Sequence, residues 1–197
     1  MKKVLFLVSH VGSGSGSVYE SLNAHPRIQG FSFNNVYSSS IRLMSLTANK
    51  HKLMNNSRIY MDHLLYNYQI SDRSLLSCCS FVYVVREPEA SIDYLIGSGT
   101  YSREQAKMYY LYRIRRICEL AKRTPGSTFL THANLRDGKG LDLIERQLRL
   151  KDSIPRINWI DGEKMKNHLR IEEYDSLSQA YEKYLYFVSN IGCLGVK

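Results

Sequence analysis

The sequence has no apolar run that approaches the roughly 20 residues needed to cross a bilayer. Residues 4–8 form an apolar run after Met1-Lys2-Lys3, as the core of a signal peptide would. This run is too short, however, and it leads into glycines in place of a cleavage site. We therefore expect a cytoplasmic protein without a membrane anchor.

Cysteine is scarce, and its spacing fits neither a metal site nor a disulfide framework. The chain has four cysteines, of which two are adjacent and cannot easily bridge to each other: Cys78, Cys79, Cys118 and Cys193. The Asp-x-Asp metal motif of many glycosyltransferases is also missing. We expect reduced thiols, as in the cytosol.

Acidic residues are outnumbered, since 18 Asp and Glu stand against 27 Lys and Arg, for a formal net charge of +9. This balance favours anionic partners, which on charge alone include nucleotides, sulfated sugars, nucleic acids and membrane surfaces. The basic residues are scattered, without the long basic tail typical of nucleic-acid-binding arms. We expect no nucleic acid as a partner. Oligomeric state leaves no signal in the sequence.

Short apolar runs alternate with helix-length segments along the chain. The runs and β-branched stretches predict strands at 4–8, 28–33, 58–65, 80–85 and 128–131. Apolar spacing and helix-boundary residues predict helices at 17–24, from 88, at 102–123, 141–150 and 176–188, and a weaker one within 36–56. Such alternation favours a single α/β domain over residues 1–197, with a mainly parallel central sheet between two layers of helices.

Glycine and serine alternate directly after the first predicted strand. The segment comprises Gly12, Ser13, Gly14, Ser15, Gly16 and Ser17. A flexible linker is a poor interpretation between a buried strand and a helix, whereas glycine amides, serine hydroxyls and a helix N-terminus together suit a phosphate group. The segment lacks the lysine of a Walker A loop and the G-x-G-x-x-G spacing of a dinucleotide-binding loop.

With the following helix and His25-Pro26-Arg27-Ile28, this segment resembles the sulfotransferase family. That family has a Pro-Lys/Arg-Ser-Gly-Thr-Thr loop, a helix and often a His-Pro-x-Ile segment, and its Ser-Gly-Thr-Thr falls on residues 13–16. The resemblance extends over about residues 3–150. It implies a P-loop-NTPase-like sulfotransferase fold and a loop that holds the 5′-phosphosulfate of PAPS (3′-phosphoadenosine 5′-phosphosulfate). One departure is that the basic residue of the family's loop falls on Gly12.

A second part of the resemblance is the strand that runs into Arg86-Glu87-Pro88. In the family this arginine binds the 3′-phosphate of the donor, a task that suits a planar, permanently charged guanidinium. The family's serine eight residues later is Tyr94 here, so Ser91 or the Tyr94 hydroxyl would take its place. The alternative for Arg86 is a salt bridge to Glu87 or Glu89.

Histidine supplies the candidate for proton transfer. Met61-Asp62-His63-Leu64 matches the family's Lys-Thr-His-Leu element, whose histidine is the base, and His63 lies 23 residues before Arg86 (86 − 63). With an ordinary pKa near 6.5, histidine suits this task at neutral pH. The alternative is a histidine that caps a strand or packs under a tyrosine. His10, in the loop, is a candidate for direct contact with the donor.

The resemblance therefore implies a PAPS-dependent sulfotransferase that transfers a sulfuryl group to a hydroxyl or amine of a carbohydrate, small molecule or peptide. The product nucleotide would be PAP (3′-phosphoadenosine 5′-phosphate), and the reaction would need no metal. Two alternatives stay open: a nucleotide-sugar glycosyltransferase, and a catalytically degenerate domain that binds a nucleotide or polyanion.

Overall fold

A computed structural model describes residues 4–30, 58–65, 76, 79–156 and 174–190. Its centre is a five-stranded sheet in which every pair of neighbouring strands is parallel. The strands are β1 (Val4–Ser9), β2 (Ile28–Gly30), β3 (Ile59–Leu64), β4 (Cys79–Val85) and β5 (Thr128–Thr131). Their order in the sheet is β2-β3-β1-β4-β5, so that β1 is the central strand.

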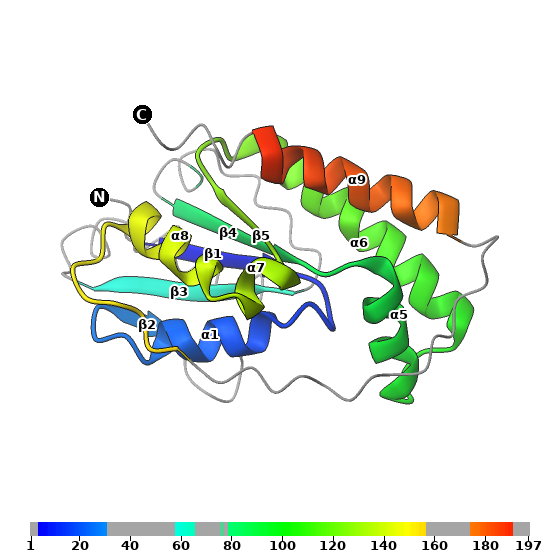
Figure 1. Ribbon diagram of the computed structural model, residues 1–197, viewed down its shortest axis with the longest axis horizontal. Helices are drawn as coiled ribbons and strands as arrows, with labels where there is room; N and C mark the ends of the chain where they lie inside the picture. The colour runs from blue at the N-terminus through cyan, green and yellow to red at the C-terminus, as the bar shows by residue number, and fades with distance from the viewer. Residues whose placement is uncertain (1–3, 31–57, 66–75, 77–78, 157–173, 191–197) are drawn as a thin grey trace.

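The helices cover both faces of this sheet, which confirms the predicted α/β class with three layers (Figure 1). They are α1 (Ser15–Asn23), α5 (Pro88–Gly97), α6 (Arg103–Arg123), α7 (His132–Arg136), α8 (Lys139–Leu148) and α9 (Tyr174–Asn190). One face packs against α5, α6 and α9, and the other against α1, α7 and α8. The helix expected within 36–56 lies outside the described residues.

Successive side chains of β1 point to opposite faces of the sheet and contribute to two separate hydrophobic cores. Val4, Phe6 and Val8 point to the α6 side, and Leu5 and Leu7 point to the α1 side. All six residues of this strand are buried, as is typical of a parallel strand covered on both faces.

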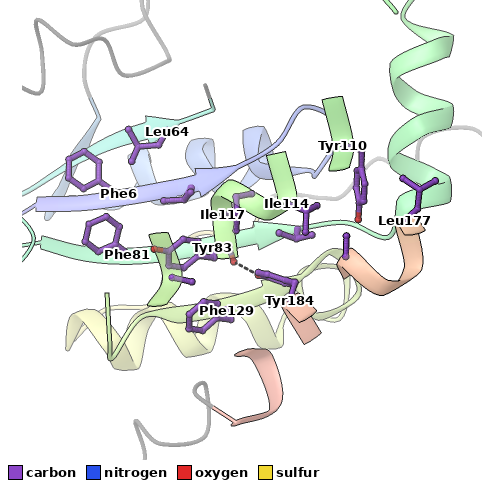
Figure 2. Close-up of a cluster of buried hydrophobic side chains, with 14 of the residues drawn as sticks. Phe6, Leu64, Phe81, Tyr83, Tyr110, Ile114, Ile117, Phe129, Leu177 and Tyr184 are labelled. Atoms are coloured by element: carbon purple, nitrogen blue, oxygen red, sulfur yellow. Dashed lines mark hydrogen bonds between the residues drawn. The ribbon is translucent and has the colours of Figure 1, made fainter. Parts of the chain in front are cut away.

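The core on the α6 side is rich in aromatic rings (Figure 2). The Tyr83 and Phe129 rings stack with centroids 4.9 Å apart. The Tyr184 hydroxyl of α9 accepts from the Leu130 amide and is 3.0 Å from the Tyr83 carbonyl oxygen, between β4 and β5. Tyr83 and Tyr184 are thus part of the core, where the Tyr184 hydroxyl satisfies backbone groups and the Tyr83 hydroxyl pairs with Thr124.

Most predicted elements agree with the structure to within two residues. The strand at 28–33 is described only as far as Gly30. α7 was not predicted, because five residues are too few for a helical repeat to show. None of the helices in the described ranges is both long and apolar enough to span a membrane.

The connections of the sheet reverse direction between β1 and β4. The chain leaves β1 through α1 on one face, and it leaves the adjacent β4 through α5 and α6 on the other. Ligands of open α/β sheets bind outside the carboxyl ends of the strands at such a reversal. Figure 1 shows the loop after β1 and the start of α5 at this same edge.

Candidate functional site: a glycine loop at the carboxyl edge of the sheet

The glycine loop folds back on itself as soon as β1 ends. The Ser13 amide donates to the His10 carbonyl oxygen at 3.2 Å, which closes a four-residue turn. Gly12, the third residue of this turn, has φ of 82°, as a type II turn requires. Gly14 has the same φ and forms the N-cap of α1. Both glycines occupy conformations that other residues adopt only with strain.

The first turn of α1 suits an anion. Its N-cap has no side chain to accept from the helix amides, and the first turn contains no acidic residue. The Ser15 amide donates to Ser13 Oγ over a long distance of 3.4 Å. A Cβ on Gly16 would meet nothing within 4 Å, so there is open space beside this turn. The positive end of the helix dipole thus has no acidic residue in its own first turn to offset it.

Arg86 lies against this loop. Its backbone amide donates to His10 Nε2 at 3.1 Å, and its Nη1 is 3.5 Å from the Gly12 carbonyl oxygen. On the other side its carbonyl oxygen accepts from the Tyr110 hydroxyl at 2.8 Å. The structure therefore brings together the two parts of the chain that were expected to hold a donor, the segment from Gly12 to Ser17 and Arg86.

The guanidinium of Arg86 retains hydrogen-bonding capacity. Its Nε is buried, and no hydrogen-bond acceptor for it is found among the described residues. Glu87 Oε1 lies 3.7 Å from this nitrogen, too far for a hydrogen bond, and the Glu87 side chain is about half exposed. Arg86 and Glu87 thus form only a long, solvent-screened ion pair, which contributes little to stability. The alternative interpretation of Arg86 as a salt-bridge residue therefore has weak support.

His63 lies on the α1 side of the sheet and reaches the loop through two serines. Its Nε2 is 2.7 Å from Ser9 Oγ, and Ser9 Oγ is 2.8 Å from Ser15 Oγ. The His63 ring stacks on the Tyr19 ring and is only 2% exposed. Burial, assisted by the charge of Arg113, lowers the pKa of His63 to about 3. His63 is therefore neutral at pH 7, and as a base it is weaker than an exposed histidine.

His10 occupies the wall behind the loop. It is fully buried, its Nδ1 is 2.8 Å from the Val11 carbonyl oxygen, and its Nε2 accepts from the Arg86 amide. Burial, with the charges of Arg113 and Arg86, lowers its pKa to about 4. Because both ring nitrogens are engaged by backbone groups, the expected direct contact of His10 with a donor would require one of these bonds to break.

Ser91 and Tyr94, the two candidates to replace the family's 3′-phosphate-binding serine, differ in their placement. Ser91 is fully buried, and its hydroxyl donates to the Glu87 carbonyl oxygen of the preceding helical turn at 2.8 Å. Tyr94 is 41% exposed, and its ring lies against Gly12, where an added Cβ would be 2.9 Å from Tyr94 Cδ1. The side chain that borders the loop is thus that of Tyr94, and the Ser91 hydroxyl is turned toward its own helix.

Two further residues of the site come from α6 and were missed in the sequence. Arg113 is 5% exposed, and it donates from Nε to the Ser9 carbonyl oxygen at 2.9 Å and from Nη2 to the Leu64 carbonyl oxygen at 2.7 Å. The Tyr109 hydroxyl accepts from the Val11 amide at 3.0 Å. Arg113 falls on the buried stripe of α6 beside Tyr110 and Ile114, and a charge on an apolar stripe is the signal that would have found it.

No protein-family model matches this chain, and no curated protein matches it significantly. Among the described residues, no group of three or more histidine, cysteine, aspartate or glutamate side chains is arranged to hold a metal ion.

The loop geometry predicts opposite effects for two glycine substitutions. Gly12→Ala should lower the free energy of unfolding by about 1 to 2 kcal/mol, because of its positive φ and the contact with Tyr94. Gly16→Ala should raise it by up to about 1 kcal/mol, since the added methyl group has space and favours the helix. Urea unfolding of both variants measures this difference. Equal effects of the two substitutions would contradict the turn described above.

Proposed function

We propose that the chain binds a nucleotide that carries phosphate or phosphosulfate groups at the carboxyl ends of β1 and β4, and that it is a PAPS-dependent sulfotransferase. The observation that carries the proposal is the joining of Arg86 to the glycine loop, by the 3.1 Å bond from its amide to His10 and the approach of its guanidinium to Gly12. The Arg86 guanidinium and the uncapped N-terminus of α1 lie close together there. Each could bind one of the two phosphate-bearing ends of a single nucleotide.

The residues present fit such a ligand. The amides at the start of α1 and the Ser17 hydroxyl would hold the 5′-phosphosulfate, beside the open space at Gly16. Ser13, in contrast, is fully buried, and its hydroxyl accepts from the Ser15 amide. The partly exposed guanidinium of Arg86 would offer donors to the 3′-phosphate. When bound, PAPS supplies both the sulfuryl group and its leaving group. The P-loop-like sulfotransferase fold is part of this proposal.

The chain's own contribution to transfer would be to hold the donor and to accept or relay a proton. His63 connects to the loop by the bonds to Ser9 and Ser15, so that a proton at the Ser15 hydroxyl has a path to His63 Nε2. Histidine in the neutral form, which its lowered pKa ensures at pH 7, is the form able to accept.

A second candidate function is nucleotide binding without turnover. Two observations favour it: position 12 has a glycine whose neighbourhood is filled by Tyr94, and His63 is buried beneath Tyr19 with a low pKa. A domain of this kind would keep the anion site and lack both the loop cation and an effective base.

Calorimetric titration with PAP tests the binding site. We expect micromolar binding by the wild type and a loss of about 30-fold, or about 2 kcal/mol, in Arg86→Ala, since a charge-assisted hydrogen bond is removed. Arg146→Ala, on the exposed side of α8, is the matched control and should bind as the wild type does. The absence of binding by folded wild type, or preference for UDP over PAP, would overturn the proposal and favour the glycosyltransferase alternative. If PAP binds, incubation with PAPS and phenol or carbohydrate acceptors distinguishes transfer from binding without turnover.

A further inference from the structure

His10 connects two segments that are 76 positions apart in the chain. On one side the ring belongs to the glycine loop, because Nδ1 is hydrogen-bonded to the carbonyl oxygen of Val11 at 2.8 Å. On the other side Nε2 holds the amide of Arg86, the first residue after β4.

The hydrogen positions on His10 follow from its partners. A carbonyl oxygen only accepts, so the bond to Val11 requires a hydrogen on Nδ1. A backbone amide only donates, so the bond from Arg86 requires a lone pair on Nε2. His10 is therefore fixed as the neutral tautomer with hydrogen on Nδ1. The lowered pKa, caused mainly by burial, agrees with this assignment.

The environment keeps this ring in place. His10 is fully buried, and the Tyr110 ring meets it edge to face with centroids 5.3 Å apart. The Tyr110 hydroxyl donates to the carbonyl oxygen of Arg86, so both backbone polar groups of Arg86 are fixed, one by His10 and one by Tyr110. The Arg86 side chain starts from a backbone anchored in this way and lies on the Gly12 carbonyl oxygen.

We propose that His10 is a positioning residue that sets the place of Arg86 against the glycine loop, and thereby the affinity of the site for a phosphorylated ligand. It does not touch the ligand, and it acts through the bond from the Arg86 amide to Nε2. The statement about affinity rests on the proposed function, whereas the statement about the position of Arg86 does not.

Two amide substitutions separate the two halves of the His10 connection. The amide nitrogen of asparagine is bonded to Cγ, as Nδ1 of histidine is. His10→Asn therefore keeps a donor for the Val11 carbonyl oxygen and loses the acceptor for the Arg86 amide. Glutamine extends one atom further, so that its carbonyl oxygen reaches the place of Nε2, and His10→Gln keeps the acceptor for Arg86. The two variants are similar in polarity, and both leave Tyr110 in place, so they can be compared directly. Urea unfolding confirms that each is folded.

Amide hydrogen exchange, followed by NMR on the free protein, tests the link directly. We expect the Arg86 amide to exchange about tenfold faster in His10→Asn than in wild type, and within about threefold of wild type in His10→Gln. The Val11 amide, which is bonded to Tyr109, should change in neither variant and is the internal control. An Arg86 amide that exchanges alike in all three proteins would overturn the inference.

Titration with PAP tests the consequence for binding. We expect about tenfold weaker binding in His10→Asn, near-normal binding in His10→Gln, and no additional loss when His10→Asn is added to Arg86→Ala. If His10→Asn weakens PAP binding equally in the wild-type and Arg86→Ala backgrounds, its effect is a general structural one, and the proposed role is overturned. If the wild type does not bind PAP, the proposed function fails, and the position of Arg86 is judged by the exchange measurement alone.

Discussion

Replacing Arg113 with methionine is expected to lower the free energy of unfolding by about 3 kcal/mol. The buried guanidinium donates to the last backbone carbonyl groups of β1 and β3, at Ser9 and Leu64. Methionine fills a similar volume but donates nothing, so two carbonyl oxygens would lose their charged donor. Burial lowers the pKa of Arg113 to about 10, which still leaves it charged at pH 7.

Urea unfolding at pH 7 measures this effect, and Arg115→Met is the matched control. Arg115 is two residues further along α6 and exposed, so its replacement should change stability by less than about 0.5 kcal/mol. Similar effects of the two substitutions would contradict the anchoring role of Arg113. Since Ser9 leads directly into the glycine loop, we also expect weaker PAP binding in Arg113→Met.

Acidification from pH 7 to pH 5 is expected to lower the free energy of unfolding by about 3 to 4 kcal/mol through two histidines. His10 has a folded pKa of about 4 and His63 one of about 3, both below the ordinary value of 6.5. Between these values the unfolded chain binds more protons than the folded one, so stability is present above pH 6.5 and is lost as the pH falls. Each histidine contributes about 2 kcal/mol over this interval.

The surroundings of both rings oppose protonation. His10 faces the cations Arg113 and Arg86 and the ring of Tyr110, and His63 faces Arg113 and the Tyr19 ring. The neighbouring Asp62 carboxyl, which would favour protonation, accepts from the backbone amide of His63. Unfolding curves at intervals from pH 5 to 7 measure the loss. In His10→Gln the loss should be smaller by about half, because only His63 then contributes. A loss of equal size in this variant and in wild type would show that other groups cause it.

The sheet was largely predictable because each strand is a compact apolar or β-branched run. β5 has the predicted limits, and α6 begins one residue later than predicted, because Ser102 is its N-cap and forms a capping box with Gln105. α1 begins two residues before the predicted start, since Gly14 ends the loop in a left-handed conformation that a Gly-Ser repeat does not reveal. The order of the strands depends on pairings between distant segments, which local patterns do not specify.

The candidate site was predictable where its residues directly follow strands. The glycine loop and Arg86 meet because carboxyl ends of adjacent parallel strands lie at one edge. Arg113 was not predictable in the same way, because it reaches Ser9 across 104 positions of sequence and stands in a cluster of charged residues that is typical of an exposed face. The orientation of Ser91 depends on the phase of α5, which the sequence determines only once the start of the helix is known.

The central place of β1 also bears on how the chain folds. Val4 pairs with Tyr60 on one side and with Cys79 on the other, which is 75 positions away (79 − 4). During synthesis this strongly apolar strand emerges before both of its neighbours, β3 and β4, so its backbone and side chains stay unpaired while dozens of further residues are made. Such long-range parallel pairing slows folding and favours aggregation-prone intermediates. The strand that anchors the glycine loop is therefore the segment on which we expect chaperones to act during biosynthesis.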